Sequence, residues 1–173
     1  MLILVSGGAA SGKSEYAESL TLACSAMPRV YVATMEIWDD EGTARVARHR
    51  QMRKDKGFLT VEAPRRLFEA DIPSGSTALL ECMSNLCANE CFGPEGFDGA
   101  FDRIQRGVCH LQQQCANVVI VTNELFSDGT VYPAETESYL DILAQLNRAI
   151  AAQADQVWEV CCGIPVCLKG ETP

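Results

Sequence analysis

Residues 7–14 of this sequence have the types and the spacing that could bind phosphate. They read GGAASGKS and fit the pattern G-x-x-x-x-G-K-[ST]. Small residues let backbone N–H groups approach a phosphate chain closely, while Lys13 adds a positive charge and Ser14 offers a hydroxyl to Mg²⁺. The segment follows the apolar run LILV and begins a stretch of helical composition. We therefore predict a nucleotide-binding loop that contacts the nucleotide through Gly7, Gly8, Ala9, Ala10, Ser11, Gly12, Lys13 and Ser14.

A loop of this kind also needs an acidic group at the end of another strand to hold the metal, directly or through water. Residues 77–80 read TALL, a typical buried strand, and Glu81 follows them. Asn123 and Glu124 follow the run VVIVT in the same way. Because ligands gather at the carboxyl ends of parallel strands, we predict that Glu81 and Ser14 hold Mg²⁺. The alternative is that Glu81 only ends a strand at the surface.

A basic segment, residues 45–56, contains one of the two histidines of an otherwise acidic chain. In a helix, Arg45, His49 and Arg53 would share one face, which could collect a triphosphate. Neighbouring cations disfavour protonation of the imidazole, so a neutral nitrogen could attack phosphorus. On composition alone, a solvated basic helix remains the more common explanation. His110 lies in a predicted helix without reactive neighbours, and we expect it to be structural.

Strands and helices alternate along the chain, which predicts an α/β protein with a mostly parallel sheet in a single domain, residues 1–173. The predicted strands are short apolar runs at 2–5, 30–33, 77–80, 118–122 and 157–161. The predicted helices cover 13–26, about 40–55, about 98–116 and 136–153. In the last of these, the spacing of Tyr139, Leu140, Leu143, Leu146 and Ile150 indicates a face that packs on the core.

Composition restricts the partners and the compartment. A formal net charge of −9 leaves no general basic surface for a polynucleotide, so we expect no nucleic-acid partner. No apolar run is long enough to span a bilayer, and the N-terminus lacks the pattern of a signal peptide, so we expect a cytoplasmic protein. Nine cysteines without closely paired metal-ligand spacing favour reduced thiols, most of them buried as small hydrophobic residues.

Taken together, five stretches resemble the successive motifs of a known family. They are MLILVSGGAASGKSEYAE, ATMEIWDDEGTARVARHRQMR, LLECMSNLCAN, VVIVTNE and ADQVWEVCCGIPVCLKG. In this order they are similar to the bifunctional adenosylcobinamide kinase and adenosylcobinamide-phosphate guanylyltransferase of cobalamin synthesis, from residue 2 to about residue 170. The resemblance implies a three-layer RecA-like P-loop NTPase fold, a homotrimer, and His49 as the site of guanylylation.

The resemblance also implies two reactions and several residue roles. ATP or GTP would phosphorylate adenosylcobinamide, and GTP would then pass GMP through a GMP-histidine intermediate to adenosylcobinamide phosphate, giving adenosylcobinamide-GDP. Lys13 and His49 would be catalytic, with Mg²⁺ as the cofactor. Beyond the phosphate loop, the nucleotide would be contacted by Ala33, Thr34, Met35, Arg50, Arg53 and Glu62.

Two other functions stay open from the sequence. A plain P-loop small-molecule kinase would move only the γ-phosphoryl group, and no nucleotide would become attached to His49. A nucleotide-binding regulatory module would bind GTP or ATP without turnover. An oligomer acting on DNA would share the fold, but the acidic composition weighs against it.

Overall fold

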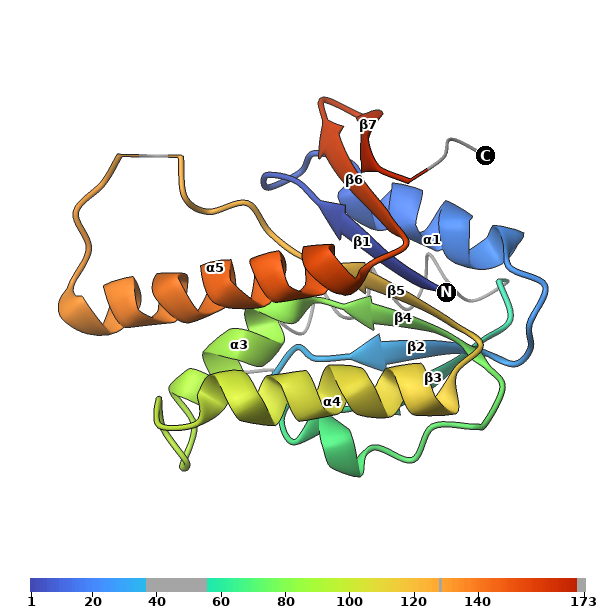
Figure 1. Ribbon diagram of the computed structural model, residues 1–173, viewed down its shortest axis with the longest axis horizontal. Coiled ribbons are helices and arrows are strands. Elements are labelled where there is room, and N and C mark those ends of the chain that lie inside the picture. Colours follow the sequence, from blue (N-terminus) through green and yellow to red (C-terminus); the bar gives the residue numbers. More distant parts are fainter. Residues whose placement is uncertain (37–55, 128, 171–173) are drawn as a thin grey trace.

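The computed structural model of the chain describes residues 1–36, 56–127 and 129–170. Its centre is a seven-stranded sheet with the strand order β3-β2-β4-β5-β1-β6-β7 (Figure 1). Neighbouring strands run parallel, except that β7 runs antiparallel to β6. The strands are β1 (Leu2–Ser6), β2 (Arg29–Ala33), β3 (Phe58–Glu62), β4 (Thr77–Glu81), β5 (Asn117–Val121), β6 (Gln156–Cys161) and β7 (Ile164–Lys169).

Most predicted elements are confirmed with shifted ends. The helices are α1 (Lys13–Ala23), α3 (Met83–Cys91), α4 (Ala100–Gln114) and α5 (Ala134–Gln153), with a short 3₁₀ helix, η1 (Leu67–Glu69). All five predicted strands are present, and three of the four predicted helices correspond to α1, α4 and α5. The predicted helix at about 40–55 lies outside the described residues.

The sequence did not predict β3, β7 or α3. The two strands lie at the edges of the sheet, and their side chains are mostly exposed, so they lack the apolar run of a buried strand. β7 also contains Pro165, which occurs in sheets mainly on edge strands. α3 is only nine residues long and includes Ser84 and Asn85, which are weak helix formers.

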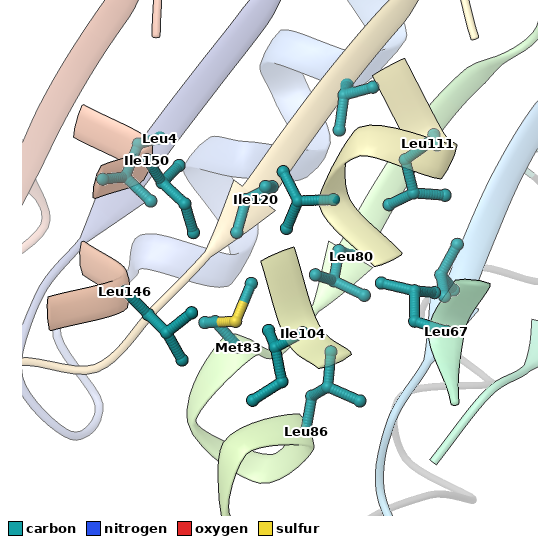
Figure 2. Close-up of a cluster of buried hydrophobic side chains, with 14 of the residues drawn as sticks. Leu4, Leu67, Leu80, Met83, Leu86, Ile104, Leu111, Ile120, Leu146 and Ile150 are labelled. Carbon is teal, nitrogen blue, oxygen red and sulfur yellow. The ribbon is translucent and has the colours of Figure 1, made fainter. Parts of the chain in front are cut away.

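Helices cover both faces of the sheet. Side chains alternate across each strand, so each face carries its own cluster of buried apolar residues. Leu4 and Leu80 face the side on which α3, α4 and α5 pack, and Figure 2 shows this larger cluster. Val5 and Leu79 face the opposite side, where Ala17 of α1 packs against them. The result is the predicted three-layer α/β arrangement.

Six parallel strands bring their carboxyl ends to one edge of the sheet, and four of them carry the residues considered next. The loop of residues 7–12 leaves the end of β1, and Glu81 is the last residue of β4. Thr34 follows β2 and Thr122 follows β5. Since β5 separates β1 from β4, the loop and Glu81 are two strand positions apart, and α1 closes the gap between them.

Candidate active site

The predicted phosphate loop joins a buried strand to a helix, as the motif requires. Gly12 caps α1 with a φ of 92°, a left-handed conformation that residues with a Cβ rarely adopt. The loop is held by its own backbone, because the N–H of Ser11 donates to the carbonyl of Gly8 at 3.3 Å. Ala9 and Ala10 lie exposed at its tip.

Gly7 lies where no side chain fits. A Cβ on this residue would be 2.5 Å from Ser11 Oγ and 2.6 Å from the carbonyl oxygen of Val160. A Cβ on Gly8, by contrast, would have no neighbour within 4 Å. The first glycine therefore permits close packing of the loop against β6, while the second leaves open space on the loop.

Lys13 begins α1 and is 9% exposed. Its Nζ donates to the carbonyl oxygen of Gly8 at 2.9 Å, so the ammonium lies across the loop. Burial lowers the pKa of Lys13 below its ordinary value, and negative charge on Cys82 or Glu81 would oppose this shift. A phosphate bound in the loop would supply the negative charge that a buried ammonium requires.

Ser14 and Glu81 are brought together from separate elements. The Ser14 hydroxyl donates to Glu81 Oε1 at 2.5 Å, joining the first turn of α1 to the end of β4. Mg²⁺ binds oxygen ligands and usually keeps several waters, so a hydroxyl and a carboxylate at one position fit this ion. These are the two residues that the sequence predicted for the metal.

Thr34 has a structural role that the sequence did not predict. Its side chain is buried, and its hydroxyl accepts from the N–H of Cys82 at 2.7 Å and donates to the Cys82 carbonyl at 2.9 Å. The N–H of Thr34 donates to the Glu81 carbonyl at 3.2 Å. Thr34 therefore fixes the backbone that carries Glu81, and a direct contact with nucleotide stays a prediction.

The remaining residues predicted to bind nucleotide lie away from the loop or outside the described part of the chain. The strand register places Glu62, Ala33 and Glu81 level with one another at the carboxyl edge. Glu62 is exposed, and four strand spacings separate β3 from β1, about 19 Å in all. Met35 follows two residues after β2 and is half-buried. Outside the described residues lie His49, Arg50 and Arg53.

The described residues on either side of that segment are both held by ion pairs. Glu36, shortly after β2, pairs with Arg65 at 3.1 Å. Lys56 pairs with Glu18 on α1, and Glu18 is almost completely buried. The chain therefore leaves the described structure beside the carboxyl edge of the sheet and returns to it against α1.

A polar cluster that sequence reasoning missed lies at the ends of β4 and β5. The amide of Asn123 donates to Ser84 Oγ at 2.6 Å, and Ser84 Oγ lies 3.0 Å from Cys82 Sγ. The Asn89 amide donates to the carbonyls of Thr34 and Pro64 at 2.7 and 2.9 Å. The available signal was the three polar residues in the run MSNLCAN, of which Ser84 and Asn89 belong to this cluster, but their partners depend on the strand order.

The other two predictions about reactive side chains have clear outcomes. His110 is structural as predicted, since its Nε2 lies 2.8 Å from the carbonyl oxygen of Ala70. All nine cysteines lie in the described residues and are free thiols. Only four of them are buried, so the prediction that most are buried was wrong. In residues 1–36, 56–127 and 129–170, no group of three or more His, Cys, Asp or Glu side chains could hold a metal ion.

The fold and the loop between β1 and α1 are those of the P-loop NTPase fold class. A KaiC-like protein from Pyrococcus horikoshii OT3 shares the fold at a TM-score of 0.50, with 12% identity over 91% of this chain and 69% of that one. Another Pyrococcus horikoshii OT3 structure reaches a TM-score of 0.54 with 8% identity, covering 99% of this chain and 87% of that one. At such low identity these similarities concern the fold alone.

Within that class, residues 3–168 match the family of cobinamide kinase / cobinamide phosphate guanyltransferase, and the chain belongs to this family. The bifunctional adenosylcobalamin biosynthesis protein CobU of Escherichia coli (strain K12) is 37% identical over 184 residues, covering 98% of this chain and all of that one. CobP of Pseudomonas aeruginosa, which carries the same description, is 30% identical over 97% of both chains. None of the helices described here is long and apolar enough to cross a membrane.

Proposed function

We propose that this protein carries out both reactions of its family, phosphorylating adenosylcobinamide and then transferring GMP to the product to give adenosylcobinamide-GDP. The proposal rests on the family match over residues 3–168 together with the arrangement at the carboxyl edge of the sheet. There Ser14 contacts Glu81, and the Lys13 ammonium lies across the adjacent loop. A fold match alone would support only nucleotide binding.

In the kinase step, the loop of residues 7–14 holds the phosphates of ATP or GTP. Backbone N–H groups and the Lys13 ammonium stabilise the negative charge that develops on the γ-phosphoryl group. Mg²⁺, held by Ser14 and Glu81, would neutralise charge on the phosphate oxygens. A hydroxyl of adenosylcobinamide attacks the γ-phosphorus, its proton leaves, and the nucleoside diphosphate departs.

In the guanylyl step, His49 acts as the nucleophile. A neutral imidazole nitrogen attacks the α-phosphorus of GTP, pyrophosphate leaves, and GMP remains bound to the histidine. A phosphate oxygen of adenosylcobinamide phosphate then attacks the same phosphorus and frees His49. Arg50 and Arg53 would stabilise the phosphate charge, and Glu62 would contact the guanine nucleotide. The resemblance and the family match support these roles.

We also propose a cytoplasmic homotrimer in which residues 1–173 form one catalytic unit. The resemblance supports the trimer, and the single seven-stranded sheet supports one unit. Nine free thiols fit a reducing compartment. Sedimentation at several protein concentrations measures the oligomeric state directly.

The GMP-histidine is tested by intact-protein mass spectrometry after incubation with GTP and Mg²⁺. We expect a mass gain of one GMP that is lost in acid and is absent from His49→Ala. The matched control is His110→Gln, which removes the only other histidine and should still form the adduct.

Each alternative function gives a different result. A protein without adduct that still converts adenosylcobinamide to its phosphate would be the plain kinase. Binding of GTP without adduct and without phosphorylated product would identify a regulatory module. Lys13→Ala should abolish phosphorylation in either enzyme, because it removes the charge that the loop places on the phosphates.

A further inference from the structure

The hairpin that joins β6 to β7 has an unusual turn. Cys161 ends β6, Ile164 begins β7, and the two residues between them are Cys162 and Gly163. Their φ values are 52° and 80°, both left-handed, as in the tight turns that match the twist of antiparallel strands. Asn or Asp is the usual first residue of such a turn, and a cysteine here places a thiol at the tip of the hairpin.

The turn brings two adjacent sulfur atoms together. In an extended strand, neighbouring side chains point to opposite faces. The left-handed conformation of Cys162 breaks this alternation, and the Sγ atoms of Cys161 and Cys162 lie 4.0 Å apart. Both residues are exposed. The Sγ atoms of Cys87 and Cys91 on α3 are also 4.0 Å apart, but both of those residues are buried. The exposed pair is therefore open to reagents in solution.

The same turn supports the phosphate loop. The N–H of Gly163 donates to the carbonyl of Ser11 at 2.8 Å, and the hairpin lies beside the loop that joins β1 to α1 (Figure 1). A Cβ on Gly12 would lie 3.4 Å from Gly163 Cα, so the two backbones are in close contact. Because the carbonyl and the N–H of a trans peptide point in opposite directions, holding the Ser11 carbonyl toward the hairpin aims the Gly12 N–H away from it.

A bond between the two sulfurs would disturb this support. Adjacent Cα atoms are about 3.8 Å apart, whereas bridged cysteines usually have Cα atoms about 4.4–6.8 Å apart. A bridge between these two residues would therefore be strained. The strain would act on the backbone of the turn, which includes Gly163. Exposed and strained bridges of this kind are readily reduced again.

We propose that Cys161 and Cys162 form a reversible modification site for low-molecular-weight disulfides, and that their oxidation weakens nucleotide binding in the adjacent phosphate loop. The proposal goes beyond the two reactions above but depends on that loop binding GTP. The partner is recognised by its chemistry, a disulfide such as oxidised glutathione, and the product is a bridge between adjacent residues.

The exchange is balanced in two steps. The pKa of Cys161 is raised because its thiol donates to the Cys162 sulfur. Cys162, at the tip of the turn, is taken as the first nucleophile. The Cys162 thiolate attacks one sulfur of the disulfide, forms a mixed disulfide and releases one thiolate. The Cys161 thiolate then attacks Cys162 sulfur, forms the protein bridge and releases the second thiolate. Two protein thiols are oxidised, and one small disulfide is reduced to two thiols.

The experiment equilibrates the full chain with glutathione buffers of increasing oxidised fraction and measures two quantities on each sample. Peptide mass spectrometry detects the loss of two hydrogens that accompanies a bridge. It also locates the bridge and so distinguishes Cys161–Cys162 from bridges that involve Cys167. Fluorescence titration with a labelled GTP reads the affinity. We expect about tenfold weaker binding in the bridged protein, as for the loss of one backbone hydrogen bond that orders the loop, with full recovery on reduction.

Linkage gives a second readout. If the bridge weakens GTP binding tenfold, saturating GTP must shift the ratio of reduced to bridged protein tenfold toward the reduced form at constant glutathione. Cys161→Ser and Cys162→Ser should abolish both responses. Cys109→Ser is the matched control. It removes an exposed thiol on α4, which packs on the face of the sheet opposite α1, and both responses should remain.

Four outcomes would overturn the proposal. The first is the absence of a Cys161–Cys162 bridge at every glutathione ratio. The second is a bridge that leaves GTP affinity unchanged, and the third is a response that survives in both serine variants. The fourth is reduced protein that does not bind GTP, and this alone would also count against the proposed function. The bridge is mapped without nucleotide, so the failure of either idea is recognised separately.

Discussion

Substitution of Gly7 by alanine tests whether the phosphate loop depends on close backbone packing. The φ of Gly7 is not positive, so alanine can adopt its conformation and the only change is the added methyl group. That Cβ would meet Ser11 Oγ at 2.5 Å and the Val160 carbonyl at 2.6 Å. Ser11 can change rotamer, but Val160 is a buried residue of β6 and its carbonyl is backbone. The loop or the strand must move.

The cost follows from overpacking of a well-packed site, about 1–3 kcal/mol in the free energy of unfolding. For a chain of this size, 1 kcal/mol changes Tm by about 2–4 °C, so Tm should fall by about 2–12 °C. If the loop moves instead of the strand, part of this cost appears as weaker GTP binding, about tenfold for each 1.4 kcal/mol.

Gly8→Ala is the matched control, because its φ is also not positive and its Cβ would have no neighbour within 4 Å. In the absence of nucleotide we expect its unfolding free energy to stay within about 0.5 kcal/mol of the parent. Urea unfolding followed by circular dichroism measures both variants. Equal stability of Gly7→Ala and Gly8→Ala would show that the packing of the loop against β6 does not constrain it.

Two further predictions concern the strand ends and α5. Glu81→Gln keeps the shape of the side chain but removes its charge, so the Mg²⁺ concentration for half-maximal phosphorylation should rise about tenfold or more; an unchanged value would remove Glu81 from the metal site. Burial raises the pKa of Tyr139 above its ordinary value, so the folded protein keeps this proton more strongly than the unfolded chain. Stability should therefore fall as pH rises above about 10, more steeply than in Tyr139→Phe; parallel urea-unfolding curves of the two proteins between about pH 8 and 11 would contradict this.

Much of the site could be predicted because its chemistry is local in sequence. The phosphate loop needs only consecutive residues, from the strand before it to Lys13 and Ser14 after it, and the structure has this arrangement. Glu81 could be predicted because it ends a clear apolar strand. The meeting of Ser14 with Glu81 follows once both strands belong to one parallel sheet.

Thr34 shows why other roles could not be predicted. A threonine after an apolar strand can face a ligand or the protein interior, and the sequence does not distinguish these cases. The choice depends on β2 lying beside β4 in a register that sets Ala33 against Glu81. Only then does the Thr34 hydroxyl meet both polar groups of Cys82 and hold the backbone next to Glu81.

The support of the phosphate loop by the β6–β7 hairpin is non-local in the same sense. Val160 and Gly163 reach Gly7 and Ser11 because β6 pairs directly with β1, a neighbour relation that no local pattern contains. Residues that contact phosphate can thus be recognised from a motif, whereas residues that aim those contacts depend on the strand order. Substitutions in the hairpin should therefore alter GTP affinity although the hairpin belongs to no motif. Oxidation of the exposed thiols of Cys161 and Cys162 tests the same dependence without a substitution.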